Sequence, residues 1–106
     1  MQKNTTQHMR KDRLQRAEYI IDHLGDFGEV IMEKQWLNKD NSICYRQLTN
    51  KGVIIVLNAE KTKVVTCFIA TILQIKQMYF GKIPNWLYKI ATKNELLVND
   101  ADYQKL

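Results

Sequence analysis

Residues 44–70, CYRQLTNKGVIIVLNAEKTKVVTCFIA, decide the fold of this chain. With their immediate flanks they hold three runs rich in apolar and β-branched residues, over residues 42–49, 53–58 and 63–70, separated by turn-forming sequences. Runs of this kind predict β-strands. Because the connections between them are short, the strands are expected to pair as antiparallel neighbours in a meander.

Residues 28–37 allow two interpretations. Val30, Met32 and Trp36 alternate with polar residues, as in a strand with one face in water. Lys34 interrupts the apolar side, however, and the same residues could form two helical turns. We favour a strand at the edge of the sheet, where a charge is tolerated and blocks pairing with other chains.

Helices are predicted before and after the meander. Residues 7–24 carry apolar side chains at helical spacing, and Gly25 provides a C-terminal stop. A capping box at residues 71–74 predicts the start of a second helix, which is expected to end near residue 80. Pro84 favours the first turn of a third helix, because its missing N–H is not needed there.

The predicted fold class is therefore α+β. It has an N-terminal helix, an antiparallel meander of three or four strands, and two C-terminal helices, with the helices packed on one side of the sheet. At 106 residues, with ordinary globular composition, the chain is expected to form one domain over residues 1–106. Its ends, residues 1–6 and 98–106, are expected to be loose.

Several functional classes are disfavoured by what the sequence lacks. The longest unbroken apolar run, residues 53–57, is far too short for a membrane span, and the polar, basic N-terminus has no apolar signal region. Cys44 and Cys67 have no metal-like spacing and predict reduced thiols in a cytoplasmic protein. No P-loop, dinucleotide-binding fingerprint or paired-carboxylate motif is present, so no cofactor and no metal are expected.

The net charge of +5 is unevenly distributed. Residues 1–16 and 71–93 are basic, while residues 17–70 are nearly balanced. Two basic segments flanking a neutral sheet could form one positive face that attracts nucleic-acid phosphates, although lysines that merely solvate helix surfaces would look the same. The candidate nucleic-acid-binding residues are Arg10, Arg13, Arg16, Lys63, Lys76 and Lys82.

The meander also carries a resemblance. Its strands read Tyr45 and Arg46, then GVIIV over residues 52–56, then KVVTCF over residues 63–68, after a basic His- and Arg-rich helix. This pattern over residues 8–70 resembles the barnase–EndoU–colicin–RelE class of small ribonuclease domains, especially its phage-encoded members. In that class an N-terminal helix and a curved sheet hold the RNA. The chain departs from the pattern because no histidine lies in or after the meander.

The resemblance implies a metal-free ribonuclease site, which needs a base, an acid and cations around the phosphorane. The candidate catalytic residues are Arg46, Thr66 and His8, with Tyr45 and Lys63 as further candidates. Arg46 alternates with apolar neighbours and is the strongest of them. Each also has an ordinary explanation: an ion pair for Arg46, a β-branched strand residue for Thr66, an exposed imidazole for His8.

Three functions remain open on the sequence alone. The first is a small phage- or mobile-element-type protein that binds nucleic acid, with RNA favoured, or a nucleic-acid-processing enzyme, without clear catalysis. The second is a metal-independent endoribonuclease of the RelE or colicin type. The third is an inhibitor that blocks a host nuclease by protein–protein contact, for which a homodimer is conceivable. Fold resemblance alone does not choose among them.

Overall fold

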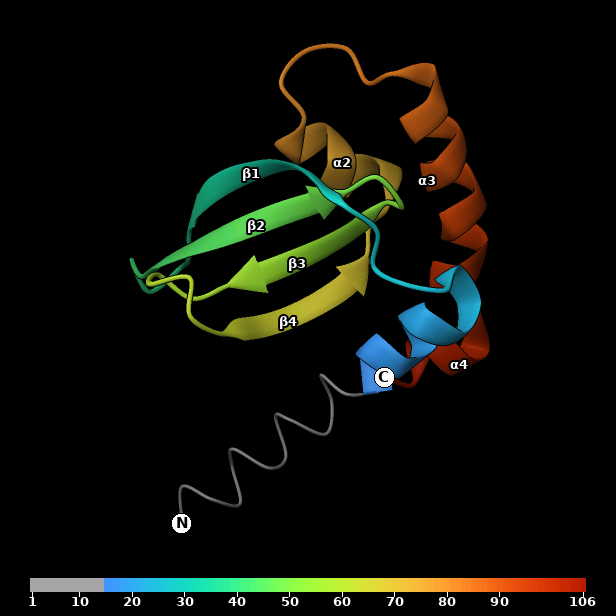
Figure 1. Ribbon diagram of the computed structural model, residues 1–106, viewed down its shortest axis with the longest axis horizontal. Coiled ribbons are helices and arrows are strands. Elements are labelled where there is room, and N and C mark those ends of the chain that lie inside the picture. The colour runs from blue at the N-terminus through green and yellow to red at the C-terminus, as the bar shows by residue number, and fades with distance from the viewer. Residues whose placement is uncertain (1–14) are drawn as a thin grey trace.

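The computed structural model describes residues 15–106 and shows an α+β fold (Figure 1). A helix over residues 15–24 precedes a four-stranded antiparallel sheet, and further helices follow it. The bounds are β1 Val30–Leu37, β2 Ile43–Thr49, β3 Val53–Leu57, β4 Val64–Ile69, α2 Ile72–Met78, α3 Asn85–Val98 and α4 Ala101–Gln104. The predicted fold class is confirmed.

The sheet is a simple meander in the order β1-β2-β3-β4, and every neighbouring pair is antiparallel. Residues 28–37 therefore contribute a strand and not two helical turns, and β1 lies at an edge as expected. One register line crosses all four strands: Lys34 lies opposite Arg46, Arg46 opposite Val56, and Val56 opposite Thr66. This line organises the candidate site.

Apolar side chains form two cores, one on each face of the sheet. On the first face, Leu48 and Ile54 pack with residues of α2 and α3 such as Ile75 and Leu87. On the second face, Val53, Cys67 and Ile69 pack with Tyr19 and Ile20 of the helix over residues 15–24. The expectation that all helices lie on one side of the sheet is therefore wrong. Both faces of the central strands are apolar, so each face requires its own cover.

Helix α3 links the two cores. Its N-terminal half contributes Leu87 and Ala91 to the first core, and its C-terminal half contributes Leu97 and Val98 to the second. In Figure 1, α2 lies behind the sheet, α3 runs beside the strand ends, and no described helix crosses the near face of the strands over most of their length. The described helices therefore leave a substantial part of the second face uncovered.

The predicted capping box opens α2. Thr71 Oγ1 accepts a hydrogen bond from the Gln74 backbone N–H at 3.2 Å, and Gln74 Oε1 accepts from the Thr71 N–H at 2.9 Å. The helix ends at Met78, because Tyr79 is already extended with φ −77° and ψ 126°. It is thus shorter than its pattern predicts. Pro84 provides the N-cap of α3, with φ −59° and ψ 147°.

We expect Thr71→Ala to lower the free energy of unfolding by about 1 kcal/mol, the usual loss when a helix loses an N-cap hydroxyl. Urea denaturation followed by circular dichroism measures this change. Thr92→Ala is the matched control, since the Thr92 hydroxyl is exposed and only donates to the Tyr88 carbonyl within α3. The control should change the stability by no more than about 0.5 kcal/mol. Equal effects of the two substitutions would show that the capping box does not stabilise the fold.

The C-terminal segment contains a short helix that contacts the sheet. The sequence predicts loose ends at residues 1–6, which lie outside the described residues, and at residues 98–106. In the latter segment α4 forms, and its Tyr103 packs into the second core. The Tyr103 hydroxyl accepts a hydrogen bond from the Ile69 backbone N–H at 3.1 Å. Burial raises the pKa of Tyr103. The Tyr103 side chain thus connects the C-terminal segment to β4.

Over residues 15–106 no helix combines the length and the apolar character that crossing a membrane would require.

Candidate functional site

The predicted residues Arg46 and Thr66 lie on one face of the sheet. Residues directly opposite each other in antiparallel strands project their side chains to the same side. Lys34, Arg46, Val56 and Thr66 therefore share a face, and Val56 belongs to the core that α2 and α3 cover. With strands about 4.8 Å apart, the line from Lys34 to Thr66 is about 14 Å long.

Arg46 is held between two aromatic rings. Its guanidinium carbon lies 4.1 Å from the ring centroid of Trp36 and 5.9 Å from that of Phe68. The side chain is half-buried, and its Nε is buried without a hydrogen-bond partner. A buried N–H left unpaired costs about 1–3 kcal/mol, which is of the same order as the gain from the two cation–π contacts. The site therefore positions a guanidinium whose hydrogen-bonding capacity is not fully used.

A further cation lies near each end of this line. Arg16 Nη1 donates to Thr66 Oγ1 at 3.3 Å, so the helix over residues 15–24 brings its guanidinium to β4. Lys34 Nζ donates to the Gln77 carbonyl at 2.9 Å and lies 5.6 Å from the Trp36 ring centroid. We call the group Arg16, Lys34, Arg46 and Thr66 the sheet cation row.

No described carboxylate neutralises the cations of this row. The ion pairs found within residues 15–106 are Lys51 with Asp26 and Lys61 with Glu33. Glu33 lies on β1 next to Lys34, but its neighbours in the register place it on the opposite face of the sheet. The sheet cation row is therefore a strip of positive charge with a polar hydroxyl at one end.

Two more of the predicted cations lie together. Lys76 of α2 and Lys82 of the following loop line one surface depression with Asn85 and Tyr88. The same loop carries Phe80, whose side chain is 99% exposed. Because Lys34 bonds to Gln77 near the end of α2, this loop begins close to one end of the sheet cation row.

The remaining predicted residues do not join this arrangement within the described chain. Lys63 is exposed next to the β3–β4 turn, where its backbone bonds to Asn58. His8, Arg10 and Arg13 lie outside the described residues. Their proposed roles stay predictions.

A second polar cluster lies on the other face of the sheet. Lys61, in the β3–β4 turn, pairs with the Glu33 carboxylate and lies 4.3 Å from the ring centroid of Tyr45. Gln47 Nε2 also donates to Glu33 at 2.8 Å. The bonds from Lys61 and then Gln47 hold the pKa of Glu33 below its usual value. Tyr45, considered with Arg46 for catalysis, thus lies across the sheet from it.

His23 and the two thiols lie apart from the row. The His23 ring stacks on Tyr19 with centroids 3.9 Å apart, and its Nδ1 lies 2.9 Å from the Tyr19 carbonyl. Cys44 and Cys67 are buried, and burial raises the pKa of Cys67. Within residues 15–106 no cluster of three potential metal ligands is found. The row therefore offers cations, a hydroxyl and aromatic faces.

The sequence did not reveal the aromatic residues of this site, Trp36 and Phe68, or the contribution of Lys34. Trp36 lies in residues 28–37, for which the sequence allows either a strand or a helix. Phe68 follows Thr66 by two residues, and this spacing places both side chains on one face only if the segment is a strand. In the sequence, Lys34 only interrupts the apolar side of a possible strand. Only the register shows that it lies opposite Arg46.

No protein family, curated protein or solved structure matches this chain.

Proposed function

We propose that this protein binds nucleic acid, with single-stranded RNA favoured, through the sheet cation row and the α2–α3 loop. The observation that carries the proposal is Arg46: a guanidinium between Trp36 and Phe68, with a buried unpaired Nε and no carboxylate partner among the described residues. A protein that holds a cation at this cost to stability is expected to use it for an anionic ligand.

The chemistry of the row suits a phosphate. A guanidinium presents planar donors that match phosphate oxygens, and charge-assisted hydrogen bonds are stronger than neutral ones. Arg16 and Lys34 lie near the two ends of the row, and the Thr66 hydroxyl can donate its own hydrogen to a phosphate oxygen while it accepts from Arg16. A row about 14 Å long can contact more than one phosphate group at a time. A polyanion therefore fits it better than a single small anion.

The α2–α3 loop adds features typical of single-strand binding. Residues 71–93 contain four lysines and no carboxylate, and Phe80 and Tyr88 expose ring surface among them. Exposed aromatic rings stack on unpaired bases, which a duplex keeps inside its own stack. This combination favours a single strand over a duplex.

Binding is tested with a fluorescently labelled single-stranded oligoribonucleotide, followed by anisotropy at low salt. We expect the wild-type protein to bind and Arg46→Gln to bind at least about tenfold more weakly, since a hydrogen bond to a charged group contributes about 1.5–3 kcal/mol. Lys105→Gln is the matched control, because it removes a positive charge at the C-terminal end of the chain, outside the row.

Equal affinities of the wild type and Arg46→Gln would exclude the row as the binding site. Equal losses for Arg46→Gln and Lys105→Gln would show a response to net charge alone. No binding by the wild-type protein would contradict the proposal and direct attention to a nucleic-acid-processing protein as the partner.

A metal-independent endoribonuclease is the second candidate. The observation that favours it is that Arg46, Thr66 and Arg16, all candidates from the sequence, contribute to one row. The described residues bring no imidazole to this row, so an acid and a base would have to come from elsewhere, His8 included. Expressing the wild type beside Thr66→Ala and examining total RNA separates the functions: cleavage that Thr66→Ala abolishes indicates the enzyme, and intact RNA indicates a binder.

A further inference from the structure

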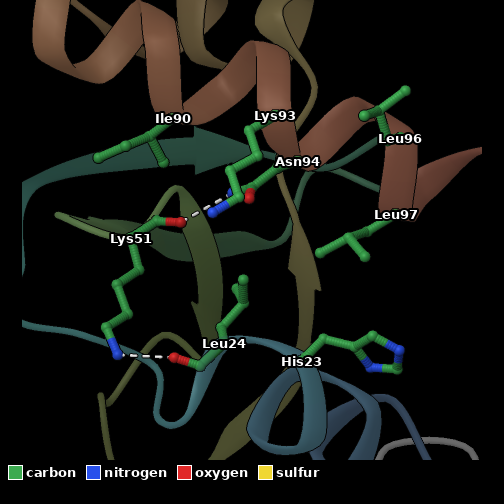
Figure 2. A pocket seen from close by; sticks show the side chains of 8 residues that line it. All are labelled: His23, Leu24, Lys51, Ile90, Lys93, Asn94, Leu96 and Leu97. Atoms are coloured by element: carbon green, nitrogen blue, oxygen red, sulfur yellow. Dashed lines mark hydrogen bonds between the residues drawn. The ribbon is translucent and has the colours of Figure 1, made fainter.

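A cavity remote from the sheet cation row lies where three segments of the chain meet (Figure 2). The end of the helix over residues 15–24, the β2–β3 turn and the part of α3 from Ile90 to Leu97 border a volume of about 350 Å³. Small-molecule sites in proteins typically occupy 300–1,000 Å³ and combine apolar walls with a few polar groups. This cavity has the size and the composition of such a site.

The walls of the cavity are mostly aliphatic. Leu24 comes from the N-terminal helix, and Ile90, Leu96 and Leu97 come from α3. Leu96 is 75% exposed, which leaves apolar surface in contact with water. An alkyl group placed here would remove that surface from water, at a gain of about 25 cal/mol per Å² buried.

The ionisable side chains that line the cavity are His23, Lys51 and Lys93. The His23 ring stacks on Tyr19, and its Nδ1 lies 2.9 Å from the Tyr19 carbonyl. The Lys51 ammonium already has two partners: its Nζ donates to the Leu24 carbonyl at 2.7 Å and forms an ion pair with Asp26 at 2.9 Å. Lys93 also lines the cavity, and within residues 15–106 its ammonium has no hydrogen bond or ion pair. No carboxylate is among the lining residues. The cavity therefore offers one uncommitted positive charge beside apolar walls.

The floor of the cavity has a structural role. Asn94 is only 2% exposed, and its Nδ2 donates to the Lys51 carbonyl at 2.8 Å. This bond joins α3 to the β2–β3 turn and keeps the cavity in shape. Figure 2 shows this bond together with the bond from Lys51 to Leu24. Lys93 is thus the lysine of the lining that has no partner among the described residues and can meet a ligand.

We propose that this cavity binds an aliphatic carboxylate, whose alkyl chain packs against Leu24, Ile90 and Leu97 and whose carboxylate pairs with Lys93 Nζ. Such a group occurs both on a free short-chain acid and at the C-terminus of a peptide that ends in an apolar residue. The inference stands apart from the nucleic-acid proposal, because its residues and its ligand are different.

The test is a chemical-shift titration of the isotope-labelled full chain with hexanoate, and in a second arm with N-acetyl-leucine as an analogue of a peptide terminus. We expect saturable shifts centred on residues 24, 90, 93 and 97. Hexylamine, with the same alkyl chain and the opposite charge, is expected to produce none. Stronger binding of one acid than of the other identifies the source of the carboxylate.

The decisive variant is Lys93→Gln, which we expect to weaken hexanoate binding roughly fivefold, the upper range for an exposed ion pair. Lys89→Gln is the matched control, since Lys89 is an exposed lysine of the same helix that does not line the cavity. Absence of saturable shifts, an equal response to hexylamine, or equal affinities of Lys93→Gln and the wild type would each overturn the proposal.

Discussion

Gly52→Ala is expected to lower the free energy of unfolding by about 3 kcal/mol, from backbone strain and overpacking together. Gly52 has φ +76°, a conformation that L-residues adopt only at a cost. An added Cβ would also lie 2.8 Å from Asn94 Nδ2 and 3.3 Å from Ile90 Cγ2, so α3 would have to move away from the β2–β3 turn. Because Asn94 is nearly fully buried and bonds to Lys51, it cannot move cheaply.

Gly81→Ala is the matched control for this prediction. Gly81 has φ +92°, but an added Cβ would meet nothing within 4 Å, so only the backbone strain of about 1–2 kcal/mol applies. Urea denaturation of both variants beside the wild type gives the comparison. Equal losses at the two glycines would show that the close approach of α3 to the turn contributes nothing to stability.

Arg46→Met is expected to abolish most RNA binding without destabilising the protein. The methionine keeps an unbranched apolar stem between Trp36 and Phe68, and it removes the buried Nε that lacks a partner. Loss of the unpaired N–H offsets loss of the cation–π contacts, so the free energy of unfolding should change by no more than about 1 kcal/mol. Residues retained for function often carry such a cost to stability.

Denaturant unfolding and anisotropy on the same Arg46→Met preparation measure both effects. Leu48→Ala on the same strand shows that the unfolding assay responds, since a fully buried leucine typically contributes about 2–5 kcal/mol. A loss of stability at Arg46→Met comparable to that of Leu48→Ala would identify Arg46 as a structural residue. The packing of Arg46 between the aromatic rings would then be explained by stability alone, without an anionic ligand.

Much of the fold was predictable because its signals are local. The strand runs of residues 42–70, the capping box at Thr71 and the edge position of β1 each follow from neighbouring residues and turn chemistry. The placement of helices on both faces was missed, because it depends on which apolar face of β3 each helix covers. The contact of the C-terminal segment with β4 could not be predicted, because its hydrogen bond joins Ile69 to Tyr103, 34 residues apart.

The candidate site was predictable only in part. Alternation with Cys44 and Leu48 singled out Arg46 as half-buried, and the structure confirms its burial. The contributions of Lys34, Trp36 and Phe68 arise from the register between strands, which a single sequence does not specify. Arg16 reaches Thr66 across 50 residues of sequence, and only the packing of its helix reveals that contact.

The salt dependence of RNA binding tests the central proposal most directly. Each phosphate contact in a single strand contributes about −0.7 to the slope of log K against log salt, so the three contacts by Arg16, Lys34 and Arg46 predict a slope of about −2, which contacts by the lysines of the α2–α3 loop would make steeper. Arg46→Gln should make this slope less negative by about 0.7, while Lys105→Gln should leave it unchanged. A wild-type slope near zero, or the same slope in the wild type and Arg46→Gln, would contradict the assignment of the sheet cation row to phosphate binding.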